Sequence, residues 1–161
     1  MRKLISIAAI GKNAELGFQN ALIWSLKGDM TFFKQTTRGH TVVMGLNTYR
    51  SIGKALPHRE NIVLSFEAIS LNDAKVFTSF DNLLKYLKTL NDEIYICGGA
   101  SIYHLFMPLV DEMLLTRINA TTTQVDTYFP AFNPEDFTTT ILETGIEQGI
   151  EYQIIRYQRK K

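Results

Sequence analysis

The sequence predicts an α/β fold with a mixed, mostly parallel central sheet, helices flanking that sheet, and an antiparallel pair at its C-terminal edge. Short apolar segments alternate with helix-like segments over residues 41–118, which is typical of parallel strands joined by crossover helices. Lys3–Ile10 is an almost continuous apolar run, as expected of a central strand buried on both faces. The last third of the chain instead alternates polar and apolar residues, which favours antiparallel pairing.

Length and composition limit the possible functions. The 161 residues, 45% of them hydrophobic, are expected to form a single domain over residues 1–161, since domains usually contain ~100 to 200 residues. A net charge of +1 without a dense basic block argues against nucleic acid as a partner. The longest apolar run, residues 5–10, is far shorter than the ~20 residues of a membrane span. A single cysteine and no secretory signal indicate a cytoplasmic protein.

The next elements are a loop and a helix. Residues 11–21 have no helical or strand periodicity and are too many for a tight turn, so we expect an irregular functional loop. Ser25 is the expected N-cap of the helix, because it directly precedes a periodic apolar stretch, and Gly39 lies beyond the end of that helix. The apolar face of this helix is expected to contain Leu26, Met30, Phe32 and Phe33.

The middle of the chain supplies further strands and a helix. Four leucines recur at helical spacing over residues 81–90 and predict a helix there. Residues 137–142 and 151–157 alternate polar and apolar side chains across a glycine-containing connection, which predicts the antiparallel edge pair. The other predicted strands cover residues 41–44, 61–65, Lys75–Phe77, 93–97 and 112–118.

Asp29 is the acid with the most informative position. It lies one helical turn before Phe33 and next to Met30, so its carboxylate projects toward the apolar face of the helix. An acid near a helix N-terminus is often explained by the macrodipole alone, which contributes ~0.3–1 kcal/mol. A buried carboxylate also suits a ligand with two N–H donors, because each charge-assisted hydrogen bond is worth roughly 1.5–3 kcal/mol. Position alone leaves both explanations open.

Two predicted strands end in glycine and lead directly into a helix, at residues 43–53 and 93–103. Gly98 and Gly99 leave backbone N–H groups uncovered, which suits a pyrophosphate, although a glycine pair is as often only a tight turn. At the other junction, the hydroxyl of Thr48 can donate to a phosphate. Together the two junctions indicate a dinucleotide.

Two other kinds of chemistry find little support. His40, His58 and His104 are not spaced as metal ligands, and one cysteine cannot complete a zinc site, so no metal is expected. No serine lies in a Gly-x-Ser-x-Gly turn, which argues against a serine hydrolase.

Residues 16–37, LGFQNALIWSLKGDMTFFKQTT, resemble the signature of dihydrofolate reductases, above all in the spacing of Trp24, Asp29 and Phe33. The resemblance implies a dihydrofolate-reductase-like fold, reduction of 7,8-dihydrofolate to 5,6,7,8-tetrahydrofolate by hydride transfer from NADPH, binding of antifolate inhibitors, and a monomer. It spans nearly the whole chain in the family's order and continues through residues 43–53, 56–65, 96–103, 115–116 and 126–130.

The resemblance also implies a substrate site. Asp29 looks like the carboxylate that holds the amino group and adjacent ring N–H of the pterin, while solvent supplies the proton to N5. Trp24 would position an ordered water, and Thr116 would hydrogen-bond the carboxylate, which completes the expected catalytic set. Arg59 would hold the glutamate α-carboxylate through a bidentate fork. The other expected substrate-binding residues are Ile7, Ala8, Met30, Phe33, Ile52 and Leu56.

The cofactor is expected on both glycine junctions and under the loop between Gly11 and Trp24, which resembles a lid over the nicotinamide. Tyr103 and Cys97 would flank the nicotinamide, and the thiol of Cys97 would be open to alkylation if it were exposed. The cofactor-binding residues expected from the resemblance are Ala9, Leu16, Gly17, Asn20, Ala21, Gly45, Leu46, Asn47, Thr48, Leu64, Ser65, Cys97, Gly98, Gly99, Ala100, Ser101, Ile102 and Tyr103.

Three positions depart from the family pattern. Ile23 stands where the family usually has proline, so a fixed backbone angle of the lid is lost. Leu46 and Ser101 stand where many members carry arginines for the 2′-phosphate of the cofactor. Each tenfold loss of preference corresponds to ~1.4 kcal/mol, so tolerance of NADH is expected. Compensating hydrogen bonds to the phosphate would come from Asn47, Thr48 and Ser65.

Two alternatives stay open. The related pyrimidine reductase of riboflavin synthesis shares the fold and the cofactor site, although an acid with the spacing of Asp29 argues against it. A non-catalytic folate- or nucleotide-binding protein would account for the absent proline and arginines, and would bind an antifolate without oxidising the cofactor.

Overall fold

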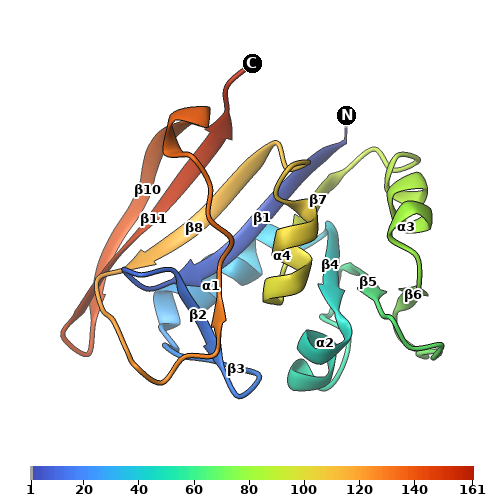
Figure 1. Ribbon diagram of the computed structural model, residues 1–161, viewed down its shortest axis with the longest axis horizontal. Coiled ribbons are helices and arrows are strands. Elements are labelled where there is room, and N and C mark those ends of the chain that lie inside the picture. The colour runs from blue at the N-terminus through green and yellow to red at the C-terminus, as the bar shows by residue number, and fades with distance from the viewer. Residues whose placement is uncertain (1) are drawn as a thin grey trace.

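The computed structural model describes residues 2–161 and contains an eight-stranded sheet in the order β10-β11-β8-β1-β7-β4-β5-β6 (Figure 1). Neighbouring strands from β8 through β6 run parallel, whereas β11 is antiparallel to β8 and β10 is antiparallel to β11. The predicted α/β class and its antiparallel edge are therefore confirmed. The strands are β1 (Lys3–Ile10), β4 (Thr41–Gly45), β5 (Glu60–Leu64), β6 (Lys75–Phe77), β7 (Glu93–Ile96), β8 (Glu112–Ile118), β10 (Phe137–Glu147) and β11 (Ile150–Arg159).

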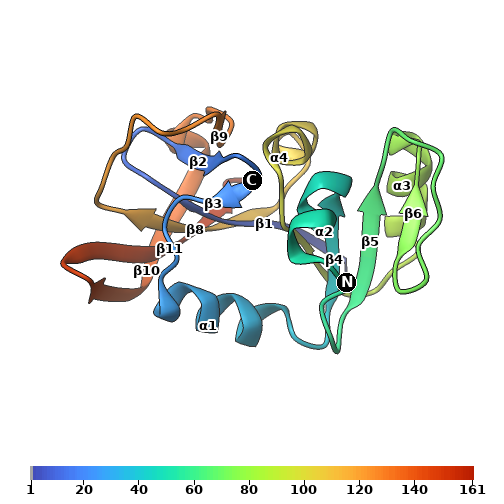
Figure 2. The same ribbon diagram turned by 90° about the horizontal axis from the view of Figure 1, so that it is seen from below.

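Helices cover both faces of this sheet. Figure 2 shows α1 (Lys27–Thr37) along one face and α4 (Ala100–Phe106) on the opposite side. Side chains from α1 and α2 (Leu46–Ile52) pack against the core that contains Ile5 and Ile7. Side chains from α4 and α3 (Phe80–Leu87) lie in the core that contains Leu4 and Ile10. This alternation along β1 is the period-two pattern of a strand buried on both faces. No helix within residues 2–161 is long and apolar enough to cross a membrane.

Ser6 is a polar residue inside this packing. Its side chain is fully buried, and its Oγ has no hydrogen-bond partner among the described residues. A buried hydroxyl without a partner costs ~1–3 kcal/mol. We expect Ser6→Ala to raise the free energy of unfolding in urea by about 1 kcal/mol. The matched control is Thr41→Val, because the Thr41 hydroxyl is also buried but donates to Asp92 at 3.0 Å. Equal destabilisation by both substitutions would contradict the prediction.

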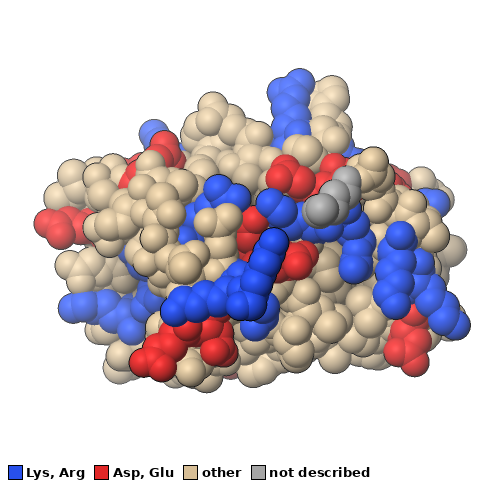
Figure 3. All heavy atoms as spheres, turned by 90° about the horizontal axis from the view of Figure 1, so that it is seen from above, with Lys and Arg blue, Asp and Glu red and all other residues tan. Residues whose placement is uncertain are grey.

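One buried carboxylate ties three strands together at the amino end of β1. Glu112 is 5% exposed; its carboxylate accepts hydrogen bonds from Arg156 at 2.8 and 3.2 Å and lies 2.7 Å from the Lys3 ammonium. These residues belong to β8, β11 and β1, respectively. Figure 3 views this end of the molecule, where lysine and arginine side chains lie around a few acidic ones.

The segment predicted as an irregular loop contains two short strands, so that prediction is wrong in part. β2 (Glu15–Phe18) pairs with β3 (Ala21–Leu22) and with β9 (Thr127–Tyr128) in a separate three-stranded sheet. Gln19 and Asn20 form the turn between β2 and β3, with φ of 51° and 61°. Two successive positive φ values are typical of a type I′ hairpin turn. These strands are too short for the sequence to display periodicity.

The start of α1 also differs from the prediction. Leu26, not Ser25, is the N-cap, and the Ser25 hydroxyl contacts the sulfur of Met30 at 3.5 Å instead of capping. Gly39 lies just beyond the helix, as predicted, with a φ of 82°. The helix expected over residues 81–90 is shorter at its C-terminal end and covers Phe80–Leu87, with Ser79 as its N-cap.

Candidate functional site

Asp29 and Thr116 are brought together although they are far apart in sequence. Asp29 lies in the first turn of α1, and Thr116 lies in β8 opposite Ala9 of β1. The Thr116 hydroxyl donates a hydrogen bond to the Asp29 carboxylate, and Thr116 is buried while Asp29 is half-buried. The expected contact between the two side chains is therefore present. It leaves the other carboxylate oxygen available to a ligand.

Burial raises the pKa of Asp29 above its ordinary value. The hydrogen bond from Thr116 acts in the opposite direction, and the nearby charge of Glu147 raises the pKa further. A carboxylate that has lost part of its hydration gains more from hydrogen bonding to a ligand with N–H donors than an exposed one does. The site therefore suits an amidine-like group such as the edge of a pterin.

Apolar residues expected around the substrate fall into two groups. Ile7 is buried, and Phe33 and Leu56 pack against the same core. Met30 is 43% exposed and Ile52 is 41% exposed, so a ligand beside α1 and α2 would cover apolar surface that water now contacts. Ala8 packs against the opposite core, so any contact it makes near Asp29 would be through its backbone.

Arg59 is anchored at the C-terminal end of α1. Its Nε donates to Thr37 Oγ1 at 2.7 Å, and its terminal nitrogens donate to the carbonyls of Pro57 at 2.7 Å and Lys34 at 3.2 Å. A guanidinium has five N–H groups, so these three bonds leave two for a ligand. The guanidinium carbon also lies 6.0 Å from the centroid of Phe33. The arginine is thus held in place beside an apolar wall.

The two glycine junctions adjoin one another. The Gly45 N–H donates to the carbonyl of Gly98 at 2.8 Å, and the Gly98–Gly99 peptide bond is cis. A Cβ atom added to Gly99 would lie 3.6 Å from the Thr48 hydroxyl. Tyr103 donates a hydrogen bond from its hydroxyl to the carbonyl of Ile7 at 2.6 Å, which connects α4 to β1. The starts of α2 and α4 therefore lie next to each other, and Tyr103 of α4 contacts β1, the strand that pairs with β8 at Thr116.

The comparison with known proteins agrees with this geometry. A family model described as dihydrofolate reductase matches residues 3–159. The chain belongs to the dihydrofolate reductase family. A dihydrofolate reductase from Staphylococcus haemolyticus is 33% identical over 150 residues, covering 92% of this chain and 87% of that protein. One from Bacillus subtilis (strain 168) is 30% identical over 158 residues, covering 96% of this chain and 93% of that protein.

A solved structure extends the similarity to three dimensions. Dihydrofolate reductase from Enterococcus faecalis, complexed with NADP(H) and RAB-propyl, superimposes with a TM-score of 0.90 at 26% sequence identity. The match covers 99% of this chain and 97% of that one. Membership of the dihydrofolate reductase family sets aside the pyrimidine reductase alternative.

In this dihydrofolate reductase family member, the segment expected to form the lid is fastened at several points. Asp126 accepts a hydrogen bond from the Gln19 N–H at 2.8 Å, and Ser51 of α2 donates to the Asn20 carbonyl at 2.7 Å. The carboxylate of Glu15 is buried and accepts from the N–H groups of Asn13 and Thr122 at 2.7 and 3.1 Å. No sequence pattern marked Glu15. Ser51 and Asp126 lie in segments that resemble the family, but no role was predicted for them, because each acts through a partner that the fold brings close.

Other lid residues also have defined places. Leu16 packs against the core under α4, and Gly17 pairs with Leu22 across the β2–β3 hairpin. Trp24 is half-buried against the cluster of Leu26 and its neighbours. Ala9 packs against that same cluster, whereas Ala21 is exposed.

Several residues expected to touch the cofactor are buried or form local hydrogen bonds. Leu64 and Ile102 are buried in the core. Ser65 is buried, and its hydroxyl donates to the Glu67 carbonyl at 2.8 Å and accepts from the Glu67 N–H at 3.0 Å. These two bonds place the hydroxyl in a local turn, and its contribution to phosphate binding stays a prediction. Asn47 and Ser101 are exposed, while Leu46, Thr48 and Ala100 are half-buried.

Cys97 is half-buried, and burial raises the pKa of its thiol to about 12, although the charge of Arg59 acts to lower it. At pH 8 a thiol with this pKa is ~10⁻⁴ ionised, against roughly a quarter for an ordinary cysteine. We therefore expect iodoacetamide to modify the native protein at least ~100-fold more slowly than the guanidinium-unfolded protein, as followed by intact mass. Equal rates in the two states would show that the thiol is freely ionised.

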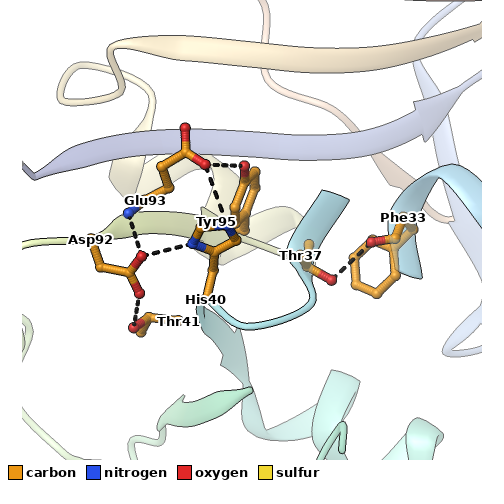
Figure 4. A network of polar contacts seen from close by, with 7 residues as sticks. All are labelled: Phe33, Thr37, His40, Thr41, Asp92, Glu93 and Tyr95. Carbon is orange, nitrogen blue, oxygen red and sulfur yellow. Dashed lines mark hydrogen bonds and ion pairs between the residues drawn. The ribbon is translucent and has the colours of Figure 1, made fainter. Parts of the chain in front are cut away.

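A second polar cluster lies where β4 and β7 begin (Figure 4). His40 Nδ1 lies 2.7 Å from the Asp92 carboxylate, which also accepts from Thr41 at 3.0 Å. The Tyr95 hydroxyl donates to Glu93 at 3.1 Å. Arg59, His40 and Asp92 border an open hollow of about 460 Å³, in which His40 and Asp92 are paired with one another. The residues in positions 2–161 include no group of three or more His, Cys, Asp or Glu suited to a metal ion.

Proposed function

We propose that this protein reduces 7,8-dihydrofolate to 5,6,7,8-tetrahydrofolate with NADPH, and so supplies one-carbon metabolism and nucleotide synthesis. The observation that carries the proposal is the half-buried Asp29 carboxylate, oriented by Thr116 beside the apolar side chains of Ile7 and Phe33. Family membership supports the reaction, and the relatives from Staphylococcus haemolyticus and Bacillus subtilis carry the name of this enzyme.

The residues divide the work of binding and orientation. Asp29 accepts hydrogen bonds from the amino group and adjacent ring N–H of the pterin, which fixes the ring and polarises it. Thr116 holds the carboxylate in one rotamer through its hydroxyl. Arg59 offers its two remaining N–H groups to the glutamate α-carboxylate of the substrate. Trp24 positions a water molecule, and the proton reaches N5 from solvent.

The nicotinamide cofactor fits the adjoining glycine junctions. Gly45 and Gly98 meet through a backbone hydrogen bond, and the junction beside Thr48 carries no side chain at Gly99 that would block a phosphate. The cofactor supplies the hydride that is transferred to C6 of the pterin. Gly45, Thr48, Gly98 and Gly99 would hold its phosphates, and the lid that includes Asn20 would exclude water from the reacting atoms.

Cofactor preference, assembly and location form finer parts of the proposal. Leu46 and Ser101 supply no positive charge for a 2′-phosphate, so NADH replaces NADPH with a modest loss of kcat/KM. We further infer a cytoplasmic monomer that binds antifolate inhibitors and consists of one domain over residues 1–161. Light scattering at micromolar concentration tests the assembly.

The direct test is to follow the absorbance of NADPH, and then of NADH, with dihydrofolate present. Oxidation that depends on dihydrofolate supports the proposal, and the ratio of kcat/KM values ranks the cofactors. Binding of a diaminopyrimidine antifolate without oxidation of either cofactor would instead support the non-catalytic alternative.

A further inference from the structure

Glu147 is a residue outside the expected site that nevertheless reaches it. It is the last residue of β10, and its two carboxylate oxygens accept hydrogen bonds from the N–H groups of Lys27 and Gly28, both at 2.7 Å. These are the first two residues of α1, and Asp29 follows directly. The N-cap residue Leu26 makes no side-chain capping bond, so the C-terminal hairpin supplies the cap that the helix lacks in its own sequence.

The close approach between hairpin and helix is built into the surrounding shape. A Cβ atom added to Gly28 would lie 2.0 Å from the Tyr152 hydroxyl oxygen, and one added to Gly145 would lie 2.5 Å from the same ring. Tyr152 therefore fits between two glycines, one on α1 and one on β10. No larger residue at either glycine would leave the ring and Glu147 where they are.

We propose that Glu147 is a positioning residue for Asp29, which fixes the first turn of α1 by capping it and acts on the neighbouring carboxylate through its charge. Glu147 takes no part in contacts with the reacting atoms. The consequence for catalysis rests on the proposed function, in which Asp29 holds the pterin. The effect of Glu147 on the ionisation of the Asp29 carboxyl does not depend on the proposed function.

Four residues, on three strands and one helix, interact with the Asp29 carboxylate. Thr116 on β8 donates to it, while Tyr103 on α4, Tyr152 on β11 and Glu147 on β10 interact with it electrostatically. The pKa values of both tyrosines are raised, chiefly by burial, so these side chains stay neutral near pH 7. Glu147 is thus the acidic member of this set, and like charges oppose the ionisation of Asp29.

The positions of these groups determine the direction in which Glu147 shifts the pKa of Asp29. Burial is the largest cause of the raised pKa of Asp29, the Thr116 hydrogen bond lowers it, and Glu147 raises it. Glutamine at position 147 keeps an oxygen that accepts from the start of α1 but removes the charge. Alanine removes both. The two variants therefore separate the charge of Glu147 from its capping bonds.

The test is a ¹³C NMR titration of the Asp29 carboxyl carbon in protein without substrate, with the signal identified by its loss in Asp29→Asn. We expect its midpoint to move to lower pH in Glu147→Gln, and to stay in place in Glu143→Gln. Glu143 is an exposed acid on the same strand, which acts electrostatically on Tyr152 instead. A titration in Glu147→Gln that superimposes on the wild type overturns the proposal.

Steady-state kinetics test the cap. Loss of an N-cap interaction is commonly worth ~1 kcal/mol, so KM for dihydrofolate is expected to rise about fivefold in Glu147→Ala, with a smaller change in kcat and recovery of most of the loss in Glu147→Gln. An unchanged KM in Glu147→Ala would overturn the proposed role of Glu147 as the cap of α1. If Glu147→Ala does not fold, Glu147→Asp, whose shorter side chain draws the carboxylate away from α1, takes its place. A protein that never oxidises NADPH with dihydrofolate refutes the proposed function, yet the NMR titration still decides the role of Glu147.

Discussion

Replacing Asp29 with asparagine is expected to lower kcat/KM for dihydrofolate by about 100- to 1,000-fold, because two hydrogen bonds to the pterin lose their charge assistance, at roughly 1.5–2 kcal/mol each. The same change is expected to raise the melting temperature at pH 7. The folded state raises the pKa of Asp29, so the stability linked to this group is fully present below its unfolded value and is lost as pH rises through the folded value. At neutral pH the ionised carboxylate destabilises the fold, and asparagine removes that cost.

The matched control for this prediction is Asp81→Asn, since Asp81 is an exposed acid in the first turn of α3. Its kcat/KM should equal that of the wild type. Stopped-flow measurement of NADPH oxidation and a thermal melt between pH 5 and pH 8 provide the two readouts. Asparagine at position 29 with undiminished turnover would mean that Asp29 has only a structural role.

Arg156→Met is expected to lower the free energy of unfolding by about 2–3 kcal/mol, because it leaves the buried Glu112 carboxylate with Lys3 alone. Breaking a fully buried pair costs ~3–5 kcal/mol. The smaller figure applies because the Arg156 side chain is 36% exposed and solvent screens part of the interaction. For a chain of this length, the loss corresponds to a fall in melting temperature of roughly 5–10 °C.

Lowering the pH should remove the difference in stability between Arg156→Met and the wild type. Burial acts to raise the pKa of Glu112, but the hydrogen bonds from Arg156 and Lys3 outweigh it and hold the pKa below the ordinary value of 4.5. The stability from this group is therefore present above the unfolded pKa and is lost as pH falls through the folded one. Urea unfolding at pH 7 and pH 3 checks the trend. Arg50→Met serves as control, because Arg50 pairs with Glu67 on the surface at 3.3 Å and should change stability by less than ~0.5 kcal/mol.

The large sheet could be predicted from the sequence because strands buried on both faces are rich in apolar residues. β1, β4, β5, β7 and β8 are short segments rich in apolar residues that lie between helical segments, which is typical of strands in a parallel sheet. The small sheet escaped prediction because β2 and β3 contain four and two residues, and only a two-residue turn with positive φ joins them. Periodicity needs more residues than that to become visible.

The candidate site was predictable to the extent that family spacing marks its residues. Asp29 and Thr116 were expected to touch and do so. The two glycine junctions were expected to bind one dinucleotide, and the structure shows that they adjoin. The cap of α1 could not be predicted, because Glu147 lies 120 residues from Lys27 and its role follows only from how the C-terminal hairpin crosses the helix. Ser25 appeared to be the cap since local sequence rules consider only neighbours in the chain.

The position of β1 determines how the protein can fold during synthesis. β1 leaves the ribosome before the other described strands, yet the strands on either side of it are β7 and β8, which begin at Glu93 and Glu112. At ~5–20 residues per second, the ~90 residues up to β7 take on the order of 5–20 s to translate. Throughout that time an apolar strand has two unpaired edges and can pair with other chains. A nascent chain that stalls before β7 therefore cannot pair either edge of β1 with the strands that flank it in the folded sheet.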